Sequence, residues 1–138
     1  MATKIFVNLP VKDLSKSIDF FTKLGYQFNP QFTDEKATCM IVSEDIFVML
    51  VVETFFKTFT KKEICDATAY TETIISLSAD KRENVDEMIK KAVQAGGTTP
   101  REPTDYGWMY QHGFQDPDGH LWEIIYMDMS KIDQASQT

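Results

Sequence analysis

An Asp-Pro-Asp-Gly tetrapeptide at 116–119 is the feature that most restricts the fold of this chain. Proline presets φ for the second position of a turn, aspartate caps the turn locally, and glycine accepts a positive φ. Runs rich in aromatic and β-branched residues lie on both sides of it, at 106–115 and 121–127. We therefore expect a β-hairpin whose turn is the tetrapeptide.

A single carboxylate, Glu123, lies in the middle of the second arm of this hairpin, among the apolar residues of 121–125. It either faces solvent in an alternating strand or points into a cavity. An unpaired buried carboxylate is costly, so a buried Glu123 should be neutral or hydrogen-bonded. It is a candidate metal ligand or general base; the alternative is a structural carboxylate satisfied by Asn8, Trp108 or Tyr110.

The composition indicates an ordinary globular protein. The 138 residues are 43% hydrophobic and 25% charged, which suits one compact domain or two small fused halves. The net charge of −7 argues against nucleic acid and against anionic membrane surfaces. No apolar run approaches the roughly 20 residues of a membrane span. Without a signal-peptide layout or a disulfide framework, we expect a cytoplasmic protein with reduced thiols.

The first half of the chain has the order β-α-β-β-β. Strands are expected at 5–11, 26–32, 37–42 and 46–52, with a helix over 14–24. Pro10 lacks an N–H, so the first strand is expected at a sheet edge or to end there. Gly25 is a suitable helix stop.

The same order recurs in the second half. A strand at 71–79 precedes a helix over 81–95, and strands follow at 98–103, 106–115 and 121–127, the first of them weakened by two prolines. The match between the halves is in pattern more than in letters. Two such halves can place two curved sheets face to face, with a pocket where they meet.

The sequence thus predicts an α+β fold of two tandem β-α-β-β-β modules. We expect a single domain over 1–128 with halves at about 4–53 and 71–128. The segment 54–70 joins them, as a plain linker or a short amphipathic helix, and 129–138 is expected to be a flexible tail.

Three stretches carry a resemblance to a known family: residues 8–26, the helix ending in Ala95-Gly96-Gly97, and residues 114–124 with the Asp-Pro-Asp-Gly turn. The chain resembles the vicinal oxygen chelate superfamily, which includes glyoxalase I, bleomycin-resistance proteins, fosfomycin-resistance enzymes and extradiol dioxygenases. The resemblance covers roughly 5–127. It implies curved mixed sheets around a cavity, and a homodimer.

The resemblance also implies where a metal would bind. Catalytic members hold a divalent ion on His, Glu or Gln from the first and last strands of each half. Glu123 stands at the final Glu position, whereas the first-strand positions fall on Phe6 and Ile74, which cannot donate. The last strand of the first half offers 48–50, with Glu53 only at its end.

A register shift of two residues preserves the side-chain facing, so Asn8 and Glu72 are the best replacements for the missing donors. Asn8 would either contact a ligand or hydrogen-bond Glu123. His120 lies three residues before Glu123, an odd number, so on a regular strand its side chain is expected to face the opposite side of the sheet.

Residues 106–115 form an unusually aromatic strand beside the expected cavity. His112 shares parity with Trp108 and Tyr110, and this face is a candidate pocket wall. The alternatives are core or dimer contact for the aromatic residues and a structural hydrogen bond for His112.

We therefore expect a protein that binds a small organic molecule in an aromatic pocket without a complete metal site, as in the bleomycin-resistance branch. The alternative is a metal-dependent lyase or dioxygenase that uses Glu123 with Zn, Ni, Mn or Fe. Glu123 is the candidate catalytic residue, and the candidate ligand-binding residues are Phe6, Asn8, Ile74, Trp108, Tyr110 and His112.

Overall fold

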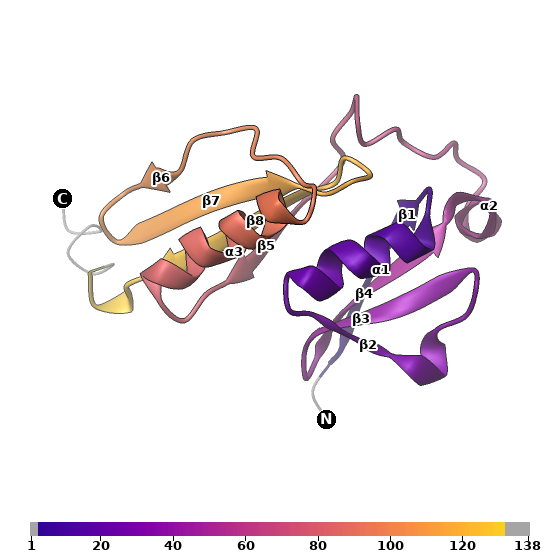
Figure 1. Cartoon of the computed structure of the whole chain (residues 1–138), viewed down its shortest axis with the longest axis horizontal. Coiled ribbons are helices and arrows are strands. Elements are labelled where there is room, and N and C mark those ends of the chain that lie inside the picture. The colour runs from indigo at the N-terminus through magenta and orange to yellow at the C-terminus, as the bar shows by residue number, and fades with distance from the viewer. Residues whose placement is uncertain (1–2, 132–138) are drawn as a thin grey trace. The chain divides into compact units, whose positions relative to one another are not determined.

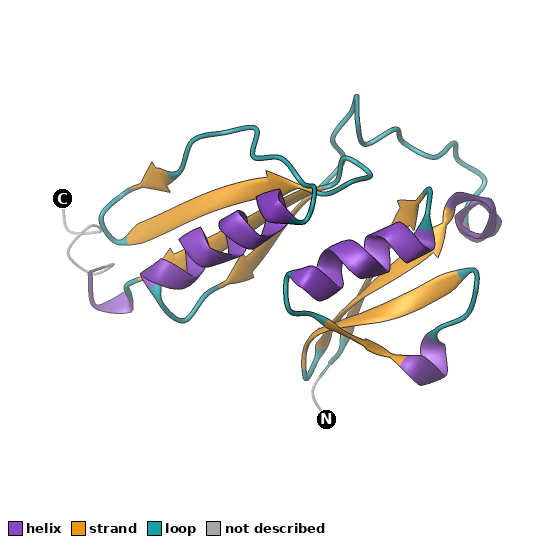
Figure 2. Cartoon of the chain, viewed as in Figure 1, coloured by secondary structure: helices purple, strands orange, loops and turns teal. Residues whose placement is uncertain are grey.

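A computed structural model describes residues 3–131 of the protein. The chain divides into two compact units, Met1–Asp66 and Ala67–Thr138. Each unit consists of a four-stranded mixed sheet with one long helix (Figures 1 and 2). None of the helices in the described part of the chain is long and apolar enough to cross a bilayer.

The first unit has the strand order β1-β4-β3-β2, in which β1 pairs with β4 in parallel and the other pairs are antiparallel. Its elements are β1 (Ile5–Val11), α1 (Leu14–Lys23), β2 (Gln27–Asn29), the 3-10 helix η1 (Pro30–Phe32), β3 (Ala37–Ser43), β4 (Ile46–Val52), α2 (Glu53–Phe56) and the 3-10 helix η2 (Lys57–Phe59).

Local sequence explains how this unit forms. The Asp13 carboxylate accepts a hydrogen bond from the Lys16 N–H at 3.1 Å and caps α1. Phe20 and Phe21 are each only 1% exposed and anchor the helix to the core. Strand alternation buries Leu9 and places Asn8 on the opposite face of the sheet.

The second unit repeats this plan with the order β5-β8-β7-β6, again with a parallel first pair. Its elements are β5 (Ile74–Ser78), α3 (Arg82–Gln94), β6 (Thr104–Asp105), β7 (Met109–Gln115) and β8 (Leu121–Met127). The helix α3 packs on β7 and β8 (Figure 1) through a buried stripe of Val85, Ile89 and Ala92.

The repeated β-α-β-β-β order and the α+β class are confirmed. The strands predicted at 5–11, 46–52 and 121–127 have the predicted bounds, and β1 with its Pro10 is an edge strand. In the segment 54–70, both alternatives hold in part. A short helix opens it, and irregular chain follows.

One predicted strand is wrong and another is shorter than predicted. In 98–103 only Thr98 bridges to another strand, at Gln115, because the prolines at 100 and 103 cannot donate to a ladder. The strand predicted at 26–32 ends at Asn29 because Pro30 begins a 3-10 helix. Of the predicted flexible tail, 132–138 lies outside the described residues.

Candidate functional site

The Asp-Pro-Asp-Gly turn is anchored to β8 by a buried carboxylate. Asp116 is 6% exposed, and one of its oxygens accepts the N–H groups of Asp118 at 2.9 Å and His120 at 3.0 Å. Its other oxygen accepts the indole N–H of Trp122 at 3.0 Å. Burial raises the pKa of Asp116. These bonds fix the turn to the strand that carries Glu123.

Glu123 lies on the face of the second sheet opposite α3. Its neighbours Trp122 and Ile124 are 1% and 4% exposed, and alternation along the strand turns the carboxylate to the other side. On the adjacent strand β5, the Ser76 hydroxyl donates to Glu123 Oε2 at 3.0 Å. Across β7, Gly113 is the direct partner of Glu123 and presents no side chain.

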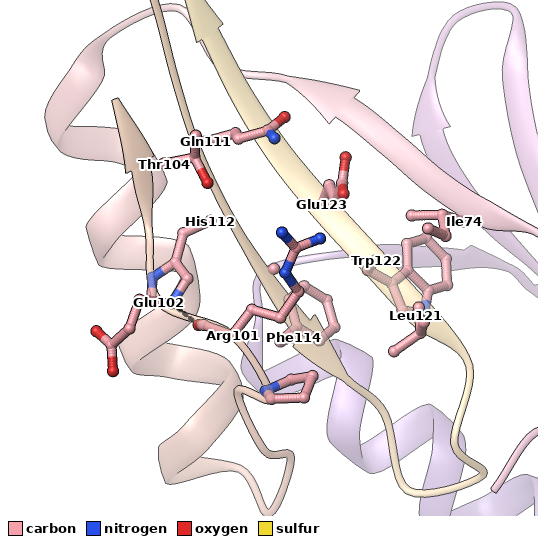
Figure 3. A pocket seen from close by; sticks show the side chains of 12 residues that line it. Ile74, Arg101, Glu102, Thr104, Gln111, His112, Phe114, Leu121, Trp122 and Glu123 are labelled. Carbon is pink, nitrogen blue, oxygen red and sulfur yellow. Dashed lines mark hydrogen bonds between the residues drawn. The ribbon is translucent and has the colours of Figure 1, made fainter. Parts of the chain in front are cut away.

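A pocket of about 110 Å³ lies over this part of the second sheet (Figure 3). Its apolar walls include Ile74, Pro100 and Leu121, and its polar groups include Arg101, Gln111 and Glu123. Because Gly113 has no Cβ, the floor opposite Glu123 stays open; a Cβ there would lie 2.9 Å from the Trp122 carbonyl oxygen.

The loop that carries Arg101 is held against β7 by hydrogen bonds. His112 Nε2 lies 2.9 Å from the Arg101 carbonyl oxygen and 2.8 Å from Thr99 Oγ1. The Thr99 hydroxyl is also 2.9 Å from the Gly113 carbonyl oxygen. In Figure 3 the His112 ring points to this loop and away from Glu123, while the Arg101 guanidinium extends across β7 toward the β8 side. His112 thus makes the structural hydrogen bonds that were one of its two expected roles.

Tyr110 is not among the residues that line this pocket, and core contact was the alternative expected for it; its ligand-binding role stays a prediction. It is 8% exposed, and its hydroxyl donates to the Asp86 carboxylate of α3 at 2.6 Å. The Arg82 guanidinium lies 4.0 Å from the centre of its ring. Gly113 pairs with Glu123 and therefore lies on the face opposite α3. Side chains alternate along β7, so the even-numbered residues face α3, and Tyr110 belongs to the core.

Trp108 precedes β7 and is not among the residues that line this pocket; its ligand-binding role stays a prediction. Phe6 and Asn8 belong to the first unit, on the face of its sheet that also carries Phe47. The Phe6 and Phe47 rings stack with centroids 4.9 Å apart. The predicted ligand roles of Phe6 and Asn8 also stay predictions.

The repeat identifies the first-unit counterparts of the site. In the first sheet, Met49 of β4 is the direct partner of Asn8 of β1. In the second sheet, Glu123 of β8 is the direct partner of Ser76 of β5. Met49 therefore stands at the position that corresponds to Glu123. Val48 and Leu50 are 1% and 0% exposed on the opposite face of the sheet. Neither can contribute to a site on the open face.

The side chains around Glu123 in the second unit do not fit a metal centre. Ser76 offers a neutral hydroxyl and Gln111 a carboxamide, whereas Zn²⁺ and related ions are held by several imidazole, thiolate or carboxylate donors. Within residues 3–131, no group of three or more His, Cys, Asp or Glu side chains is arranged to hold a metal ion.

Arg101, Ser76, Gln111 and Gly113 were not identified as site residues from the sequence. In the parallel pairing of β5 with β8, Ser76 is the direct partner of Glu123. On β7, Gln111 and Gly113 lie on the same face of the sheet as Glu123. A strand-pairing assumption would have found these three. Arg101 depends on the path of a loop, for which the sequence carries no comparable signal.

The fold and this open-faced sheet define a class of protein built from paired β-α-β-β-β modules. Residues 5–124 match the Glyoxalase/Bleomycin resistance protein/Dioxygenase superfamily, and the chain belongs to it. The predicted superfamily is therefore confirmed.

Solved structures agree with this assignment. The hypothetical protein SA1046 from S. aureus is 30% identical, with a TM-score of 0.77 over 91% of this chain and 95% of that chain. A glyoxalase/bleomycin resistance protein/dioxygenase family enzyme from Burkholderia phytofirmans PsJN has 16% identity and a TM-score of 0.75, covering 91% and 99%. The fosfomycin resistance protein FosX from Mesorhizobium loti has 14% identity and a TM-score of 0.67, covering 95% and 97%. At these two lower identities the likeness concerns the fold. No curated protein matches the chain.

Proposed function

We propose that the protein binds a small organic molecule in the pocket of the second unit, with Glu123 as the hydrogen-bond acceptor. One observation carries this proposal. Glu123 lines an apolar-walled pocket, and the structure shows one hydrogen bond to its carboxylate among residues 3–131, from Ser76 to Oε2. The second carboxylate oxygen is thus available to a hydroxyl or N–H group of a ligand.

The walls and the volume of the pocket suit a compact ligand. Ile74 is 49% exposed, so a bound molecule would remove apolar surface from water at roughly 25 cal/mol per Å². A volume of about 110 Å³ has room for several water molecules, and hence for a small ring or a short branched chain. Hydrogen bonds and apolar burial are the interactions that this proposal requires.

The proposal is tested by adding a library of small polar and apolar fragments to ¹⁵N-labelled protein and following amide NMR shifts. Ligands should shift the amides of Gln111, Gly113 and Glu123. Replacing Glu123 by Gln removes a charged acceptor worth about 1.5–3 kcal/mol, which is about 10- to 100-fold in Kd for a hydroxyl-bearing fragment.

The matched control is Glu87→Gln, which makes the same change at an exposed position on α3. It should leave Kd unchanged. The proposal is overturned if no fragment shifts the pocket amides, or if the two variants lose affinity equally.

We also propose that the protein is a homodimer, which superfamily membership supports. Sedimentation velocity at several concentrations tests this; a single species of 15.8 kDa throughout would contradict it.

A further inference from the structure

We infer that the pocket selects a small organic anion that also carries a hydroxyl or amino group, such as a short branched hydroxy acid. This inference rests on the proposed function and names the class of its ligand. Two oppositely charged side chains, Arg101 and Glu123, line one small pocket. A molecule with an anionic end and a hydrogen-bond-donating end would match both.

Arg101 is the group that would receive the anion. A guanidinium presents a planar fork of N–H donors that binds a carboxylate through two parallel hydrogen bonds. Its main chain is held by the bonds of His112 and Thr99, so the position from which the side chain starts is defined. Arg101 is the only Lys or Arg among the residues that line this pocket.

The two charged groups do not form an ion pair with each other in the described part of the chain. Among residues 3–131, Arg101 takes part in no ion pair with N–O separation within 4.0 Å, and Glu123 is bonded to Ser76 instead. The second acid of the lining, Glu102, points away from the Arg101 guanidinium in Figure 3. Arg101 therefore has donors to offer to a ligand, and Glu123 has an acceptor.

Apolar side chains line the pocket beside the two charged groups. Ile74 and Leu121 are direct partners on β5 and β8, on the same face as Glu123, and Pro100 lies beside Arg101 in the loop. A short hydrocarbon branch would cover this surface while its polar ends reached the two charged groups. This arrangement disfavours a neutral alcohol, which leaves Arg101 without an anion. It also disfavours a plain acid, which leaves Glu123 without a donor.

Three matched probes separate these requirements. They are 2-hydroxyisovalerate, isovalerate without the hydroxyl, and 3-methylbutane-1,2-diol without the carboxylate. Amide shifts of Gly113 and Glu123 in the full chain would report binding and give each Kd. The hydroxy acid should bind at least about tenfold more tightly than either of the other two, the loss expected for one missing charge-assisted hydrogen bond.

Variants assign the two ends. Arg101→Gln should weaken the hydroxy acid and isovalerate by about 10- to 100-fold and leave the diol unchanged. Glu123→Gln should bring the hydroxy acid close to isovalerate. The control Lys90→Gln makes the same charge change at an exposed site on α3, and Arg101 is itself exposed, so both proteins should keep the wild-type amide spectrum outside the pocket.

The inference is overturned if the diol binds as tightly as the hydroxy acid, or if Arg101→Gln leaves the affinity for both acids unchanged. It also fails if neutral fragments occupy the pocket and the hydroxy acid does not, an outcome that leaves the proposed function standing. If fragments of every class fail to shift the pocket amides, both fail.

Discussion

Glu123 and Met49 occupy corresponding positions in the two sheets but differ in chemistry. Each lies on the open face of its unit beside a short polar residue, Ser76 for Glu123 and Asn8 for Met49. The second sheet has a charged acceptor at this place and the first has a thioether, a weak acceptor. The two units therefore share the strand pairing at this position, but only the second unit has a charged side chain there.

Gly119 allows the turn of the second unit to pass close to the chain at 67–68. Its φ is +93°, and a Cβ would lie 2.7 Å from the Ala67 carbonyl carbon and from the Thr68 nitrogen. Gly119→Ala should therefore lower the free energy of unfolding by the roughly 1–2 kcal/mol of a left-handed residue plus about 1–3 kcal/mol of overpacking. Urea denaturation measures the loss.

Gly25 is the control for this prediction. Its φ is +106°, but in the part of the chain that the structure describes, no heavy atom beyond its two chain neighbours lies within 4 Å of an added Cβ. Gly25→Ala should show the conformational cost alone, about 1–2 kcal/mol. Equal losses for the two variants would contradict the steric argument.

Replacing Asp116 by Asn should lower the free energy of unfolding. In Asp116→Asn, one oxygen can still accept the N–H groups of Asp118 and His120, but the amide NH₂ then faces the Trp122 indole N–H, and two donors meet. A buried unsatisfied donor costs about 1–3 kcal/mol, and unfolding experiments should show this loss. Asp80→Asn, at an exposed site, is the control and should change stability little.

A double-mutant cycle with Trp122→Phe isolates the interaction. Removing the indole N–H removes the donor–donor conflict, so the two changes should couple by about 0.5–3 kcal/mol. Strict additivity would show that the Asp116–Trp122 bond contributes nothing specific.

At the level of elements, the sequence predicted strands well where burial alternates and poorly where proline interrupts them. β4 and β8 are central strands with one buried face, and their bounds could be read from apolar residues. The segment 98–103 has no alternation of apolar and polar residues, and it runs as a loop beside β7. Its local composition still suggested a strand.

The site was predictable to the same extent. Glu123 could be found because its strand is fixed by a recognisable turn and its charge breaks an apolar run. The sequence left open whether Tyr110 faces a pocket or the core, because alternation gives only the relative facing of residues within one strand. Pairing with β8 shows which face of β7 carries α3. Arg101 could not be found from the sequence, because it lies in a loop, where side-chain direction does not follow the regular alternation of a strand.

The ion pair between Arg82 and Asp105 joins the start of α3 to β6 and should make stability depend on pH. The hydrogen bond from Arg82, aided by the Gly107 N–H, holds the pKa of Asp105 below its ordinary value, and the same bond raises the pKa of Arg82. Because the folded pKa of Asp105 is below the unfolded one, the folded state binds fewer protons. The contribution is present above the unfolded pKa, about 3.9, and is lost as pH falls through the folded pKa.

Comparison with Arg82→Gln tests this dependence. The excess stability of the wild type over the variant should shrink as pH falls below about 4, leaving the contact of Arg82 with the Tyr110 ring. NMR titration should show a raised pKa for Asp105 in the variant and an unchanged one for Asp128, whose lowered pKa comes first from Ser130. A pH-independent difference in stability would contradict the prediction.

At the level of the whole molecule, superfamily membership does not decide whether this protein carries a metal; its own donors do. The first-strand positions hold Phe6 and Ile74, and the counterpart of Glu123 is Met49. Membership therefore implies the fold, while the chemistry has to be derived from the residues present in this chain.

We expect the purified protein to contain much less than one tightly bound divalent ion per chain, because no group of three or more His, Cys, Asp or Glu side chains among residues 3–131 is arranged to hold such an ion. Elemental analysis of protein purified without added metal measures this content. A chelator should leave the thermal unfolding midpoint unchanged, since removing an ion that binds only the folded state would lower it. About one ion per chain that is lost in Glu123→Gln and retained in Glu87→Gln would contradict this prediction and establish Glu123 as a metal ligand.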